Sequence, residues 1–525
     1  MPALDAPPGT PGAETGGPVY WARKLDDKLT AGYTDRKLYR DYYDGEHNIL
    51  QYASPRFLEV FGQMFSAFAD NWMALVTDSV EERLKVEGFR FGEDTTADQD
   101  AWRIWQANQL DGDAGLVHVE ALITGRGFVL VQPPDEDGGL PLVTVESSDQ
   151  VTVAVAPGSR RRRLAALKRW TDDDGRELAT VYLPDGVFKL ERRSFQALEA
   201  AGFAFRDSQL EWLPRASEGD GWAMPNPAGR CPVVPLVNNA KLPDNRPLGS
   251  GNSRQTSLLR RPRVPASEGQ SELKGLLGIQ DAASKLVVDM MTAAEFSAFR
   301  QRYATGLEVT DDPETGKPRL PFRAGADSMY WNENPEAKFG EFEQTDLKVF
   351  VAGIEMLVNH IASQSRTPPH YFAIGGQQWP SGDAIRSAEA GLSQKCRKRT
   401  VWFGESWEEA MRLAFLLSGD PEMQVKAEIE HSETVWRDVE VRTEAQHIDG
   451  LLKLASLKVP LQALWERAGF SPTEIERFQA LRRQEALELG TIGQDLNSLF
   501  NADLPPDQGQ PGPSNGQVPA DTLQQ

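Results

Sequence analysis

Apolar residues at helical spacing mark two segments on either side of a loop that cannot be helical. Residues 344–367 follow the i, i+3, i+4, i+7 pattern of an amphipathic helix, with apolar positions at Leu347, Phe350, Val351, Ile354, Leu357, Val358 and Ile361. Pro368 and Pro369 end this helix, because proline lacks a backbone donor and restricts the residue before it. Ser381 is expected to cap a second helix, Gly382 to Leu417, which would be roughly 54 Å long.

Another amphipathic helix is expected within residues 266–302. Its apolar face consists of Leu273, Leu276, Leu277, Ala283, Leu286, Val287, Met290, Met291 and Ala294. Residues 303–343, which separate it from the helix described first, contain a Pro313 to Gly316 turn and short apolar runs. Two helices around a small insert of this kind predict a helical hairpin with a folded, β-containing tip.

The hydrophobic period changes from 3.6 to 2 between Phe128 and Leu190. Turns rich in Gly, Asp and Pro divide this region into short predicted strands: Phe128–Gln132, Leu142–Glu146, Val151–Val155, Leu164–Trp170, Leu178–Leu183 and Val187–Leu190. They predict an antiparallel meander, not the alternating βαβ order of a nucleotide-binding sheet. Four arginines, Arg160 to Arg163, fall at one turn; they could contact an anionic partner, but a solvated turn is the favoured interpretation.

The chain from Val19 to Gly88 is predicted to be mainly helical. Its apolar and aromatic stripe is interpreted as core packing: Phe57, Leu58, Phe61, Met64, Phe65, Phe68, Trp72, Leu75 and Val76. Further helices are expected at Asp98–Asn108 and Leu116–Ile123, and Gly202–Pro265 is expected to be irregular because it is rich in turn residues.

Towards the C-terminus the pattern predicts strands at Met423–Glu430 and Val435–Val441, followed by helices over residues 443–490. Residues 1–18 and most of 491–525 are rich in Pro, Gly, Ala and Gln, with little apolar surface. Such segments cannot offset the entropy of ordering, so both ends are predicted to be disordered.

Charge and cysteine content narrow the function. The 525 residues include 56 Lys and Arg against 77 Asp and Glu, a net charge of −21, which argues against sequence-specific DNA binding. Cys231 and Cys396 have no disulfide or metal spacing and are expected to be buried, reduced thiols. No apolar run approaches the length of a membrane span, and no signal peptide is apparent, so a soluble protein without membrane contact is expected.

Searches for chemistry yield no catalytic residue, cofactor or metal site. The sequence lacks the phosphate-loop, nucleophile-elbow, His-Glu-x-x-His and Cys-x-x-Cys patterns. His360 and His370 are too far apart for the i, i+4 geometry of a metal-binding pair. We therefore expect that the chain is not an enzyme.

Several segments together resemble the portal proteins of tailed double-stranded-DNA bacteriophages, most closely those of siphophages that infect high-GC Gram-positive bacteria. The resemblance spans roughly residues 38 to 490. It rests on Ser365 to His370, Ser381 to Leu392 and Phe403 to Ala414, with shorter matches at Tyr42 to His47, Asn71 to Met73, Arg83 to Phe89 and Phe296 to Arg302.

The resemblance implies a mainly helical α+β fold with named parts. These would be a wing (19–265), a first stem helix (266–302), a clip (303–343), a second stem helix (344–367), a tunnel loop (368–381), a long helix returning to the wing (382–442) and crown-like helices (443–490). It also implies a homo-oligomeric ring, twelve-fold in the family, at one capsid vertex of the virion, assembled in the host cytoplasm. Its partners would be duplex DNA passing without sequence specificity, the terminase large subunit, a head–tail adaptor, and the major capsid and scaffolding proteins.

The residues assigned to these roles fall into three groups. The tunnel loop would contact DNA through Tyr371, Phe372, Ile374, Gly375, Gly376, Gln377, Gln378 and Trp379. Asp289 and Glu295 would face the pore, since a neutral or acidic bore lets DNA slide where a basic one would bind it. Stem packing and oligomerisation are assigned to Leu276, Leu286, Met290, Ile354, Leu357 and Ile361.

Two alternatives remain open on the sequence. One is another head–tail adaptor or minor capsid protein, although an adaptor is usually much shorter and lacks the helix–tip–helix–loop–helix succession. The other is a metal-dependent nuclease, which would lose activity to EDTA and for which the sequence offers no cluster of ligands.

Overall fold

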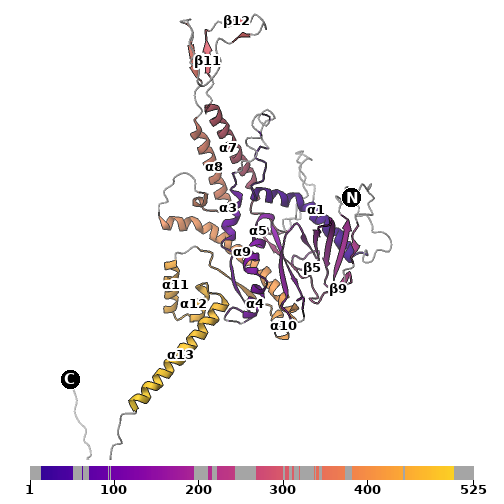
Figure 1. The fold of residues 1–525 in the computed structure, drawn as a ribbon, viewed down its shortest axis with the longest axis vertical. Coiled ribbons are helices and arrows are strands. Elements are labelled where there is room, and N and C mark those ends of the chain that lie inside the picture. Colours follow the sequence, from indigo (N-terminus) through magenta and orange to yellow (C-terminus); the bar gives the residue numbers. More distant parts are fainter. Residues whose placement is uncertain are drawn as a thin grey trace, which may run out of the picture.

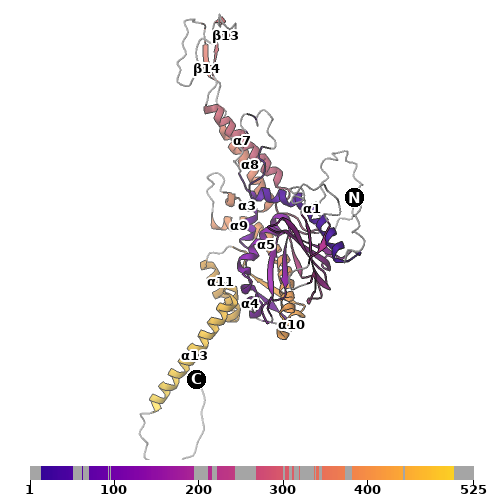
Figure 2. The ribbon, with the colours of Figure 1, turned by 45° about the vertical axis from the view of Figure 1, so that its right-hand side comes forward.

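The computed structural model consists of a central α+β body with a helical hairpin projecting from one end and a long helix from the other (Figures 1 and 2). It describes residues 14–50, 70–193, 211–242 and 268–501, plus 59 and 62, with gaps at 93, 95, 137, 216–220, 299–301, 307–309, 312–317, 320–335, 337, 342–345, 373–380 and 441–443. Most of the predicted aromatic stripe, including Phe57 to Phe68, lies outside the described residues. Val76 is buried, as predicted.

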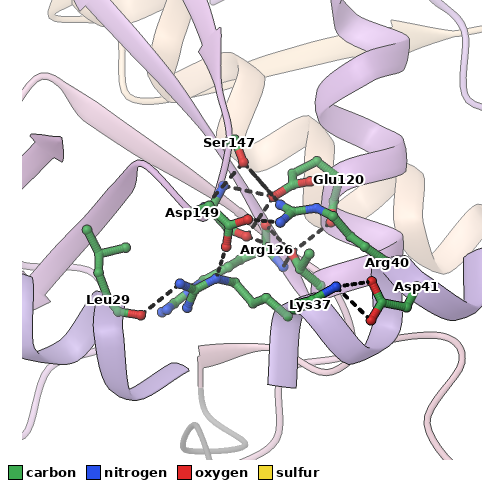
Figure 3. Close-up of polar contacts among 11 residues, drawn as sticks. Leu29, Lys37, Arg40, Asp41, Glu120, Arg126, Ser147 and Asp149 are labelled. Carbon is green, nitrogen blue, oxygen red and sulfur yellow. Dashed lines mark hydrogen bonds and ion pairs between the residues drawn. The ribbon is translucent and has the colours of Figure 1, made fainter. Parts of the chain in front are cut away.

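Helix α1 (Pro18–Tyr43) connects the β-structure of the body to the base of the hairpin. Its first half packs Val19, Leu25 and Leu29 against the large sheet, whereas Tyr42 near its end belongs to a cluster with the hairpin helices. Polar contacts hold the C-terminal third of α1: Arg36 Nε donates to Asp149 Oδ1 (2.6 Å). Figure 3 shows Arg40, whose Nη2 donates to Glu120 Oε1 (2.6 Å). These pairs fix α1 to the body at two points one turn apart.

The strand region is antiparallel, as predicted, but it forms two sheets. In the first, β2 (Arg126–Gln132) lies between β3 (Leu142–Glu146) and β10 (Val233–Val237). The second has the order β4-β5-β6-β7-β8, with β9 also paired to β7. Its strands are β4 (Val151–Val155), β5 (Arg163–Thr171), β6 (Arg176–Tyr182), β7 (Gly186–Arg193), β8 (Leu213–Pro214) and β9 (Ala223–Pro225).

Two predictions for the body were wrong. The region Gly202–Pro265 is not irregular throughout, because Val233, Val234 and Leu236 are buried in a strand that pairs with β2. The helical interpretation up to Gly88 fails at β1 (Val86–Phe91), which pairs with β15 (Ser432–Trp436) from the far end of the sequence. Neither partner strand is near in sequence, so local periodicity could not reveal the pairing.

The body helices α3 (Met73–Glu81), α4 (Gln99–Ala107) and α5 (Leu110–Thr124) surround one large core. The Asp98 side chain caps α4, as the predicted boundary implied. Gly125 ends α5 with a φ of +96°, and an added Cβ there would lie 2.8 Å from the Gln270 nitrogen. Only glycine suits this position, which brings the start of the hairpin against the end of α5.

The projecting hairpin consists of α7 (Leu277–Ala298) and α8 (Leu347–Ser365), as Figures 1 and 2 show. Its tip contains two small sheets: β11 (Arg302–Thr305) pairs with β14 (Lys338–Glu341), and β12 (Thr310–Asp311) pairs with β13 (Pro318–Arg319). The predicted helical hairpin with a small β-containing tip is therefore present.

Helix α9 (Gly382–Leu417) has the predicted bounds, and the Ser381 side chain accepts a hydrogen bond from the Ala384 nitrogen. The predicted strand at Met423–Glu430 is instead α10 (Pro421–Ala427), because Asp420 caps a helix that Pro421 begins. The last helices are α11 (Glu444–Ser456), α12 (Leu461–Arg467) and α13 (Pro472–Asn501). The predicted disordered tail from 491 begins inside α13, where Leu489, Ile492 and Leu496 continue the helical spacing.

Candidate functional site

The base of the hairpin is packed within one chain. Leu276 and Ile361 are buried in a cluster with Tyr42 and Met73, and Ile354 packs against the same cluster. The Tyr42 hydroxyl also donates to Asp281 Oδ1 at 2.5 Å. These side chains fix the hairpin to the body of its own chain. A role of Leu276, Ile354 and Ile361 in joining neighbouring subunits stays a prediction.

Further along the hairpin, Leu286, Met290 and Leu357 are half-buried. An added Cβ at Gly353 would lie 3.1 Å from Leu286 Cδ1, so α7 and α8 approach closely at this point. Leu286 therefore packs between the two helices of one hairpin. For Met290 and Leu357, a role in oligomerisation stays a prediction.

A second apolar stripe on α8 has no cover within the described chain. Val349 is 71% exposed and Met356 53% exposed, and they lie on one helix face because seven residues make about two turns. Val351, which the sequence pattern assigned to the buried stripe, is also exposed. The sequence pattern was interpreted as one apolar stripe along α8. The second stripe, with Val349 and Met356, was therefore not predicted.

The acidic residues assigned to the pore lie on α7. Asp289 accepts a hydrogen bond from Lys285, one turn earlier, so part of its charge is neutralised locally. Both Asp289 and Glu295 are partly exposed. Their orientation towards a bore stays a prediction.

The predicted loop after α8 begins with an anchored turn, the 3-10 helix η3 (Pro369–Phe372). Phe372 is buried in the hairpin-base cluster, and the Tyr371 hydroxyl accepts a hydrogen bond from Arg83 Nη2 at 2.7 Å. Arg83 also donates to the Val439 carbonyl. Tyr371 and Phe372 hold the start of the loop to the body. Their contact with DNA stays a prediction. Ile374 to Trp379 lie outside the described residues.

Glu389 on α9 completes this anchor. Its Oε1 lies 3.4 Å from His370 Nε2 and 3.6 Å from Arg83 Nη2. The first residues of α9 are therefore tied to η3, although the segment between them spans eight residues that the structure does not describe. Both ends of the predicted loop are held in place.

A buried ionic cluster joins α9 to both helices of the hairpin. Glu272, just before α7, contacts Lys395 and Arg399 and accepts hydrogen bonds from the side-chain amides of Asn238 and Asn239. Lys395 Nζ also donates to the Ser365 carbonyl at the end of α8 (3.1 Å). Burial disfavours the ionised carboxylate, but Lys395 and Arg399 outweigh it and lower the pKa of Glu272 to about 2.

Both cysteine thiols are shielded from solvent. Cys231 and Cys396 are buried, as predicted, and burial raises the pKa of the Cys396 thiol to about 11. Among the described residues no three His, Cys, Asp or Glu side chains are grouped to hold a metal ion. Nor does any helix in that part of the chain combine the length and apolarity needed to cross a membrane.

Comparison with known proteins decides the family. The family model described as phage portal protein, SPP1 Gp6-like, matches residues 23–487. The chain is 30% identical over 456 residues to the portal protein of Mycobacterium phage D29, covering 84% of this chain and 83% of the relative. It is also 30% identical over 459 residues to the portal protein of Mycobacterium phage L5, with the same coverage. The chain belongs to the phage portal protein family.

This membership confirms the resemblance read from the sequence. A portal protein is a structural component of the phage capsid, an oligomeric ring at one vertex through which the genome is packaged and released and on which other components dock. The adaptor and nuclease hypotheses are left without support. The family match spans the hairpin, η3 and α9.

Proposed function

We propose that this portal protein acts as a twelve-membered ring whose stem is the α7–α8 hairpin. The β-containing tip is the clip, the α+β body with α1 and α9 is the wing, and α11 to α13 are the crown. The terminase large subunit and a head–tail adaptor dock on the clip in turn, and the major capsid and scaffolding proteins surround the wing.

The exposed apolar stripe on α8 carries this proposal. Val349 and Met356 are large apolar side chains in open solvent on a helix whose opposite face is already buried. A neighbouring copy that covers them would remove apolar surface from water, which favours association by roughly 25 cal/mol per Å². Repeated around a ring, this contact would place stem helices side by side.

The same arrangement assigns a role to the loop. The Glu272 and Glu389 clusters fix α9 and η3 to the hairpin base, so the residues on either side of the loop are held to the body of each subunit. In the proposed ring Ile374 to Trp379 contact the duplex with uncharged side chains, and Asp289 and Glu295 keep the stem bore free of strong phosphate binding.

A charge substitution on the stripe tests the proposal. We expect Val349→Asp with Met356→Asp to give folded subunits that no longer form rings in negative-stain images, because neither side chain supports its own chain's core. Leu116→Asp is the matched control, since Leu116 is 64% exposed on α5, away from the stem. Intact rings from the double variant would rule out the stripe as a subunit contact.

A further inference from the structure

The turn between β4 and β5 carries three exposed arginines on a rigid support. Gly158 adopts a φ of +77°, and the Ser159 hydroxyl accepts hydrogen bonds from the backbone nitrogens of Arg161 (3.3 Å) and Arg162 (2.9 Å). The Ala156 nitrogen closes the turn by donating to the Arg162 carbonyl. Arg160, Arg161 and Arg162, here called the basic tip, therefore project from a fixed backbone.

Arg160 to Arg163 were predicted to form a solvated turn. In the structure Arg163 differs from the other three because its side chain is buried. Its side chain is only 7% exposed and pairs with Glu409 on α9, and it also donates to the Cys231 carbonyl. This arginine anchors the turn to α9 and to the end of the first sheet. Arg163 therefore fixes the backbone that carries the basic tip to the body.

The charge of the basic tip is largely unneutralised. Arg161 is 90% exposed and lies 3.7 Å from Glu405, itself 64% exposed, a contact that contributes little in water. Arg160 and Arg162 form no ion pair within the part of the chain that the structure describes.

We propose that the basic tip binds the phosphate backbone of double-stranded DNA outside the channel. Guanidinium groups match phosphate oxygens in a bidentate geometry, and binding of this kind is independent of sequence. The basic tip fits a protein partner less well, because Pro157 to Arg162 include no large apolar side chain to anchor an interface. With a net charge of −21, the chain as a whole repels DNA, so strong binding to phosphates must come from a local basic cluster such as this one.

The position of the basic tip fits that ligand. Glu409 is ten residues beyond Arg399 on α9, roughly 15 Å further from the hairpin base. Figure 1 shows that α9 leads from there to α10, at the end of the body away from the stem. This inference rests on the proposed function: if the clip points out of the capsid, the basic tip is on the side of the packaged genome.

The test uses rings of the full chain and small covalently closed duplex circles, which cannot thread through a closed channel. Fluorescence anisotropy is measured from 50 to 200 mM salt for the wild type and for Arg160→Gln with Arg161→Gln and Arg162→Gln. Three lost phosphate contacts should weaken binding at least about tenfold and flatten the log–log salt slope by about 2 to 3. The control removes the same charge at scattered exposed sites, Arg103→Gln, Lys453→Gln and Lys458→Gln, and should bind like the wild type.

The remaining outcomes either contradict the inference or support it. Equal affinity and slope in the tip variant and the wild type, or no binding of circles by the wild type at 50 mM salt, would overturn the inference. Loss of rings in the tip variant would also overturn it, by showing that the turn contacts a neighbouring copy. Wild-type protein that binds circles through the basic tip but forms no rings would support the inference and contradict the proposed function.

Discussion

Lys395 Nζ lies 3.1 Å from Glu272 Oε2, and both side chains are only 6% exposed. This pair connects the middle of α9, the longest of the described helices, to the residues that lead into the hairpin. Lys395 also donates to the last carbonyl of α8, so the same ammonium group contacts the chain where the hairpin begins and where it ends. These contacts hold the hairpin and α9 together.

Glu272→Gln should destabilise the fold strongly. The substitution leaves Lys395 and Arg399 buried without their counter-ion, a situation that typically costs about 3 to 5 kcal/mol. Urea denaturation measures the change. Asp449→Asn, which breaks the exposed pair with Lys453, is the control and should shift stability by less than about 1 kcal/mol. Equal, small shifts for both variants would show that the buried cluster does not hold the fold.

His118 should make stability depend on pH. It is fully buried among Phe403, Trp407 and Trp436, where its Nε2 accepts a hydrogen bond from Trp407 Nε1 at 2.9 Å. Burial lowers the pKa of His118 from 6.5 to about 3. The unfolded chain therefore binds a proton more readily, so the contribution of His118 is complete above pH 6.5 and is lost as the pH falls towards 3.

His118→Phe isolates that contribution. The variant should be less stable at pH 7, by about 1 to 3 kcal/mol, because the Trp407 N–H loses its buried acceptor. Its stability should nevertheless fall less steeply than that of the wild type between pH 6.5 and 4, as followed by urea denaturation at each pH. Parallel pH profiles would contradict the assignment.

Shortening the loop should separate assembly from packaging. Deletion of Gly375 to Gln378 leaves Tyr371, Phe372 and Glu389 in place, so we expect normal folding and ring formation. In procapsids, the deletion should reduce the amount of DNA packaged or retained. Normal packaging and retention with intact rings would remove the proposed role, and failure to form rings would show that the loop is structural.

Patterns confined to one element could be predicted from the sequence. The bounds of α9 were predictable because Ser381 caps it and prolines precede it, and the bounds of β3 and β4 because turns enclose short alternating runs. Contacts between residues far apart in the sequence could not be predicted. No local signal pairs β1 with β15, or places Glu272 beside Lys395 and Arg399, because those partners meet only in the folded chain.

In the candidate site, too, the sequence could not predict which side chains the folded chain covers. The apolar character of Tyr371 and Phe372 indicated an unusual loop, but the sequence could not show that both side chains turn back onto the body. Apolar residues on α8 were visible, yet which of them the chain itself covers depends on α1 and α3, and these are far away in sequence. Resemblance to a family supplied the function, and the structure shows which of these side chains the chain itself covers.

A reconstruction of the purified full-length chain by electron cryo-microscopy tests the central claim most directly. The account predicts closed rings of twelve copies with a central channel, with Val349 and Met356 covered by the neighbouring subunit and a stem bore without a continuous lining of Lys and Arg. Protein that forms no closed rings, or rings in which both side chains remain in solvent and lysines and arginines line the whole stem, would contradict it.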